Sequence, residues 1–193
     1  KATYFIFFSL GILLYLSIPY SAKAMSINPS ITYLIMFYAA SMIIFTMYGG
    51  GFATIPAYLA DIFGTKYVGG IHGRLLTAWS TAGVLGPLAI TQLRQGSVEK
   101  SINELVSKVD PDQFNDFYGA PIEQIQQLVQ QKTVTIGNLM QIVPEGTSDP
   151  SATLYNTTMF AMAGLLGIAL VANLLIGPVD KKHHMTKRQL EES

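Results

Sequence analysis

Four long stretches of uncharged, mostly apolar residues dominate the pattern along this chain. They cover residues 2–20, 31–60, 75–93 and 153–178. About 20 such residues suffice to cross roughly 30 Å of hydrocarbon as a helix, because a helix rises about 1.5 Å per residue. Backbone groups in lipid must be paired within their own segment, which favours helices. The pattern therefore predicts an all-α membrane protein with about four transmembrane helices.

Polar residues return in residues 94–152, between the third and fourth predicted spans, and in a tail at 179–193. Two short amphipathic helices are expected in the longer segment, because apolar residues recur there at helical spacing. The first follows an N-cap at Ser97 and the second starts at Pro121. Their apolar faces hold Val98, Ile102, Leu105, Val106 and Val109, and then Ile122, Ile125, Leu128 and Val129. A cap over the helix ends, a lid that regulates access and a partner-docking surface all remain open.

Helix-weakening residues interrupt the second stretch, which is longer than one straight crossing needs. It contains the glycines at 49–51 and Pro56, residues that weaken or kink helices. We expect a long, bent helix that ends near Asp61. A glycine-rich turn at 64–73 then leads into the third span.

Charge is sparse and balanced: 12% of residues are charged, with twelve basic and twelve acidic ones. This balance excludes the basic surface typical of nucleic-acid binding. Lys and Arg in short loops mark the cytoplasmic side of a membrane. The 64–73 turn with Arg74, and the tail with its basic residues, are therefore expected in the cytoplasm, and residues 94–152 on the outside. The predicted location is the cell (inner) membrane, with a cytoplasmic C-terminus.

Chemistry-bearing clusters are scarce in the sequence. There is no cysteine, and the adjacent His183 and His184 lie beside lysines in the tail, which favours a solvated tail over a metal site. No cofactor is expected. The spans have no ionisable residue in their interiors, so they offer no proton carrier. Without a cluster of His, Cys or carboxylates near a membrane face, an enzyme is not predicted.

Aromatic residues give the candidate binding surface. Tyr48 and Phe52 are four residues apart and share one face of the second span, and Trp79 lies about one turn inside the third. These three residues are the candidate substrate contacts, with packing against neighbouring helices or lipid as the alternative. Aromatic faces with few charges suit an organic anion whose carboxylate is held by cations elsewhere.

Three charged residues flank the glycine-rich turn between the second and third spans. Asp61 lies at the end of one predicted helix, Lys66 in the turn, and Arg74 at the start of the next. A carboxylate and a guanidinium so placed can form a charge-assisted clasp. Asp61, Lys66 and Arg74 are therefore the candidate gating residues.

One contiguous run resembles a known family. Residues 48–87 read YGGGFATIPAYLADIFGTKYVGGIHGRLLTAWSTAGVLGP. This run is similar to the oxalate:formate antiporter family within the major facilitator superfamily. The resemblance implies a twelve-helix carrier of two six-helix bundles with alternating access, of which this chain is the C-terminal part. It also implies that the second and third spans line the cavity, that the first and fourth pack outside, and that N-terminal helices of the same protein are missing here.

A departure from the family's pattern bears on the substrate. Members that exchange oxalate for formate have a lysine in the helix corresponding to the third span, where this chain has Trp79. Without this lysine, a dianion such as oxalate would lose one of its positively charged partners. The expected function is secondary active transport of a small organic anion such as a monocarboxylate. The alternative is a non-transporting structural or accessory subunit of a membrane complex.

Overall fold

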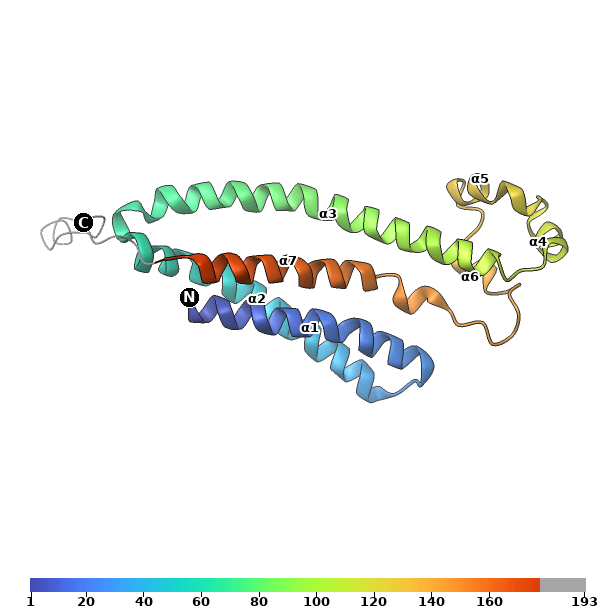
Figure 1. The fold of residues 1–193 in the computed structure, drawn as a ribbon, viewed down its shortest axis with the longest axis horizontal. Coiled ribbons are helices and arrows are strands. Elements are labelled where there is room, and N and C mark those ends of the chain that lie inside the picture. Colours follow the sequence, from blue (N-terminus) through green and yellow to red (C-terminus); the bar gives the residue numbers. More distant parts are fainter. Residues whose placement is uncertain (178–193) are drawn as a thin grey trace, which may run out of the picture.

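The fold is a small set of long helices with a cluster of short ones at one end (Figure 1). The computed structural model describes residues 1–177, and the tail predicted at 179–193 lies outside them. The described residues form helices and 3₁₀ turns without strands. In chain order these are α1 (Ala2–Ile27), α2 (Ile31–Phe63), η1 (Thr65–Tyr67), α3 (Val68–Val106), α4 (Pro111–Tyr118), η2 (Ile122–Gln124), α5 (Ile125–Gln130), α6 (Ile136–Leu139), η3 (Pro150–Thr153) and α7 (Asn156–Leu175).

Three of the described helices are long and apolar enough to cross a membrane. They are α1, α2 and the segment Pro150–Leu175 that contains α7. The third predicted span, 75–93, lies inside α3, where polar residues such as Thr77, Ser80 and Gln92 lower the mean hydropathy. A crossing by α3 therefore stays a prediction.

The first helix is longer than its apolar stretch. It was expected to end at residue 20, but α1 continues to Ile27 through Lys23. Good helix formers such as Ala22, Ala24 and Met25 extend it. The hydroxyl of Ser21, inside the extension, donates to the carbonyl of Ile18 at 2.9 Å, so this polar side chain is satisfied within the helix. The connection to α2 is correspondingly short.

The third helix is also longer than predicted, at both ends. The expected turn at 64–73 is helical from Val68 onward, and the separate amphipathic helix expected after Ser97 is the last part of α3. The prediction of an N-cap at Ser97 is wrong, because its hydroxyl donates to the carbonyl of Leu93 at 3.0 Å. That is the back-bonding pattern of a serine inside a helix. As a result, α3 is a continuous helix of 39 residues.

The apolar helices pack around α1, which contacts both α2 and α7 (Figure 1). Glycine permits the closest approach: a Cβ added at Gly11 of α1 would lie 2.8 Å from the Cδ1 of Leu166 in α7. Small residues at such points are the usual basis of helix packing in lipid. The Lys1 ammonium donates to the carbonyl of Leu174 at 3.2 Å, so the start of α1 and the end of α7 lie at the same end of the bundle.

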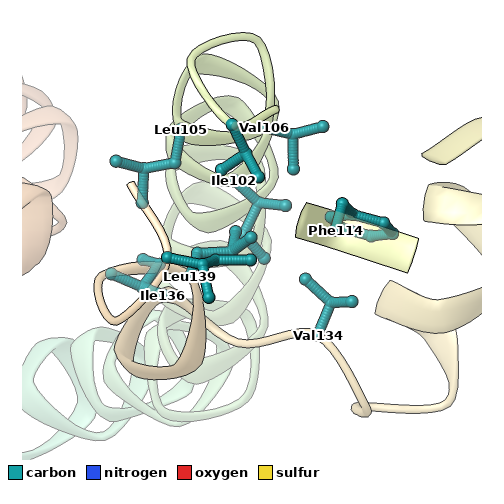
Figure 2. Packing of buried hydrophobic residues seen from close by; sticks show 9 residues of the cluster. Ile102, Leu105, Val106, Phe114, Val134, Ile136 and Leu139 are labelled. Carbon is teal, nitrogen blue, oxygen red and sulfur yellow. The ribbon is translucent and has the colours of Figure 1, made fainter. Parts of the chain in front are cut away.

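Residues 94–152 form what we call the cap, at the other end of the bundle (Figure 1). Figure 2 shows its hydrophobic core, to which the end of α3 contributes Ile102, Leu105 and Val106. Phe114 and Leu139 are completely buried there. The apolar face predicted for the second short helix is confirmed, because Ile122, Ile125, Leu128 and Val129 pack against this core. The cap thus has a core of its own, separate from the packing of the long helices.

Candidate functional site

A cavity of about 310 Å³ lies among α1, α2, α3 and α7. We call it the aromatic cavity. All three candidate substrate residues, Tyr48, Phe52 and Trp79, line it. The remaining lining residues are Tyr4, Phe7, Phe8, Gly11, Tyr15, Ile44, Met47, Gly51, Ile55 and Leu166.

Trp79 connects α3 to the aromatic face of α2. Its Nε1 donates a hydrogen bond to the Tyr48 hydroxyl at 3.3 Å. Its ring also lies against that of Phe52, with centroids 5.2 Å apart and planes at 46°. Tyr48 and Phe52 present these groups together because residues four apart share one helix face. The three predicted residues therefore form one connected cluster across two helices.

The first helix supplies the part of the cavity that sequence reasoning missed. Tyr4, Phe7 and Phe8 of α1 line it, whereas the first span was expected to pack outside. The signal was present in the sequence, since these aromatic residues recur at helical spacing in the first turns of α1. What the sequence does not specify is which neighbouring helix that face meets.

Tyr4 fixes α1 to the glycine-rich part of α2. Its hydroxyl donates to the carbonyl of Gly51 at 2.7 Å, and the Thr54 hydroxyl lies within donating distance of it, at 3.2 Å. The Tyr4 ring also contacts Tyr58, with centroids 5.1 Å apart. These contacts hold one wall of the cavity in place at the level where α2 has three successive glycines.

The chemistry of the lining is apolar and aromatic. No lining residue of the aromatic cavity carries a charge, and its polar groups are tyrosine hydroxyls and the indole N–H. Such a lining suits the uncharged part of an organic molecule, which aromatic faces contact over a large area. The counter-charge for an anion bound here must come from elsewhere.

One ionisable side chain lies close to the cluster. The ring of His72 meets that of Phe52 edge-on, with centroids 6.5 Å apart. Its Nδ1 is buried and has no hydrogen-bond partner. His72 was expected in a turn, and the early start of α3 places it in a helix instead.

The candidate gating residues are not joined in the conformation shown. Asp61 lies in the last turn of α2 and lines a separate cavity of about 280 Å³ with Lys1 and Tyr58. The Lys66 ammonium lies 5.8 Å from the ring centroid of Tyr67. Within residues 1–177, no ion pair connects Asp61 to Lys66 or to Arg74.

Fold and cavity together define a helical protein with three helices long and apolar enough to cross a membrane, built around an aromatic, uncharged cavity. Comparison of this chain with protein-family models, with curated proteins and with solved structures found no match.

Proposed function

We propose that this chain is the C-terminal part of a twelve-helix secondary carrier of the major facilitator superfamily, related to the oxalate:formate antiporter family. The carrier would move a small organic anion, such as a monocarboxylate, by alternating access. The observation that carries the proposal is the aromatic cavity, in which Tyr48 and Phe52 of α2 meet Trp79 of α3. The run that resembles the family, residues 48–87, contains all three residues.

The preference for a monoanion over a dianion rests on Trp79, at the position where the resembled carriers have a lysine. With no cation in its lining, the aromatic cavity accommodates an organic body and leaves the carboxylate to cations on helices outside this chain. One carboxylate needs one such partner, whereas a dianion needs two. Trp79 in place of a lysine fits this preference.

Charge and exposure support the proposed placement in the membrane. Large apolar side chains stay exposed along α2, α3 and α7, for example Phe45, Leu85 and Leu165. Such surfaces need lipid or further helices of the same protein as cover. In the proposed carrier the end with Lys66 and Arg74 faces the cytoplasm, as does the C-terminus, and the cap lies outside the inner membrane.

In this proposal Asp61, Lys66 and Arg74 form a latch in one conformation of the carrier only. Their separation in the conformation shown is compatible with an open latch. Because an exposed ion pair contributes at most about 1 kcal/mol, such a latch would bias a conformational equilibrium without locking it.

The test is uptake of a set of radiolabelled monocarboxylates into proteoliposomes containing the full-length protein. Trp79→Ala should lower uptake of the transported acid at least about tenfold, the effect of losing about 1.4 kcal/mol of binding. Phe160→Ala is the matched control, because Phe160 is exposed to the same degree, 53% against 52%, and lies outside the cavity. Equal kinetics for Trp79→Ala and the native protein across the whole set would overturn the assignment. Lack of uptake of any acid would favour the accessory subunit.

A further inference from the structure

A second cavity lies in the cap and shares no residue with the aromatic cavity. Its volume is about 450 Å³, and it lies between the outer part of α3, the segment around α6 and the start of η3. Val98, Ile102 and Leu154 belong to its apolar lining. Its charged lining residues are Arg94 and Lys132, and no carboxylate lines it. We call it the cap cavity.

Arg94 lies over an aromatic ring, and its guanidinium makes no hydrogen bond or ion pair with the other residues that the structure describes. The guanidinium carbon lies 5.6 Å from the ring centroid of Tyr155, a cation–π contact. In the part of the chain that the structure describes, the one ion pair joins Lys100 and Glu104, so it does not involve Arg94. A planar guanidinium with unpaired N–H groups fits a carboxylate through two parallel hydrogen bonds.

Lys132 occupies a backbone position that normally favours glycine. Its φ is +57°, in the left-handed region, directly after Gln131, the C-cap of α5. The Thr133 N–H donates to the carbonyl of Leu128, and the Lys132 N–H to that of Val129, both at 3.0 Å. This is the Schellman pattern that ends many helices, and glycine is the usual residue at its left-handed position. A lysine there destabilises the turn relative to glycine, which points to a role for its side chain.

Hydroxyl groups complete the polar side of the cap cavity, from Thr135 and Ser151. Glu99 directly follows the lining residue Val98 but lines a different cavity, with Ile125 and Gln126. Asp149 accepts the Ser151 N–H at 2.8 Å as the N-cap of η3. Its carboxylate is therefore already engaged with the backbone. The lining thus combines two exposed cations and two exposed hydroxyls with aliphatic side chains.

We propose that the cap cavity binds a small organic monoanion with a short aliphatic chain. Its carboxylate would contact Arg94 and Lys132, and its chain would lie on Val98, Ile102 and Leu154. The volume falls within the range of small-molecule sites, and a few polar groups beside apolar walls are typical of them. This proposal rests on the lining of the cap cavity and does not depend on transport.

The experiment is calorimetric titration of pentanoate into the full-length protein in nanodiscs of zwitterionic phosphatidylcholine. Lys132→Gly should raise the Kd for pentanoate at least about tenfold, while the midpoint of thermal unfolding stays equal or rises, because glycine relaxes the left-handed turn. Arg94→Gln should weaken binding similarly. Lys100→Gln is the control, because Lys100 is an exposed lysine of α3 outside the cap cavity, and it should leave the Kd unchanged.

Several outcomes would overturn the proposal. These are absence of pentanoate binding to the native protein at about 10 mM, a Kd unaffected by both Lys132→Gly and Arg94→Gln, or equal affinity for pentanol. Loss of pentanoate binding in Trp79→Ala with retention in Lys132→Gly would assign the ligand to the aromatic cavity. Displacement of pentanoate by phosphatidylglycerol in the nanodiscs would identify a lipid headgroup as the ligand.

Discussion

The ring contact between Phe52 and Trp79 gives the sharpest prediction about the aromatic cavity. Phe52→Ala, Trp79→Ala and the double variant form a mutant cycle that isolates this contact. With ring centroids 5.2 Å apart, the pair should contribute about 1 kcal/mol beyond the contacts that each ring makes alone. The unfolding equilibrium constant should then show a coupling of about fivefold.

The single Trp79→Ala change should be larger than the coupling. It also removes the hydrogen bond to the Tyr48 hydroxyl, which at 3.3 Å should contribute about 0.6 kcal/mol, the mean for such bonds between membrane helices. A loss of about 1.6 kcal/mol is expected from these two contacts together. Because the hydrogen bond is lost in both Trp79 variants, it cancels from the cycle and leaves the ring contact.

The assay is unfolding by sodium dodecyl sulfate in mixed micelles, followed by far-ultraviolet circular dichroism. Fluorescence is unsuitable because Trp79 is the single tryptophan of the chain. Trp79→Ala combined with Phe160→Ala is the control cycle and should be additive within about 0.5 kcal/mol. If the Phe52 cycle is as close to additive as this control, the two rings do not act as a unit and the reasoning fails.

Three further predictions concern the cap and the latch. Tyr118→Phe should stabilise the cap by about 1 kcal/mol, because the Tyr118 hydroxyl is buried without a partner. Burial raises the pKa of Tyr118, so its phenol ionises first in the unfolded chain. The native cap should therefore lose stability as the pH rises above about 10, and Tyr118→Phe should reduce this loss in pH-dependent unfolding. Phe114→Ala should destabilise the cap by about 3–5 kcal/mol, which faster hydrogen exchange in residues 98–142 would show. Phe117→Ala is the control and should have little effect, because Phe117 is exposed. Equal hydrogen-exchange rates in the two variants would contradict a core at Phe114. Asp61→Asn should shift the inward and outward populations of the full-length protein, and unchanged spin-label distances between the helix ends would count against the latch.

The sequence predicted those features that depend on local pattern. The apolar face of Ile122, Ile125 and Leu128 is visible from spacing alone, and the structure confirms that these residues pack against the cap core. The shared face of Tyr48 and Phe52 is likewise a property of one helix. Such features need no knowledge of the neighbouring elements.

Features that depend on competing local bonds or on tertiary contacts were missed. Ser97 has a hydroxyl that suits an N-cap or a helix interior, and only its bond to Leu93 in the structure distinguishes the two. The glycines before Arg74 favour a turn in isolation, yet α3 begins at Val68. The contribution of Tyr4 to the aromatic cavity depends on how α1 and α2 pack, which periodicity does not encode.

The helix α3 connects the turn after α2 to the cap and has Pro87 in its interior. At about 1.5 Å per residue, its 39 residues extend about 58 Å, from the turn after α2 into the core of the cap. Because Pro87 has no N–H to donate, α3 can bend there. Without such a bend, a tilt of about 10° around the η1 end would move the cap end by about 10 Å, which distance measurements between spin labels can resolve. Because Ile102 and Leu105 of this helix are buried in the cap core, the cap must move with the part of α3 that follows Pro87. A rigid binder on the cap should therefore restrict the motion of the part of α3 that follows Pro87.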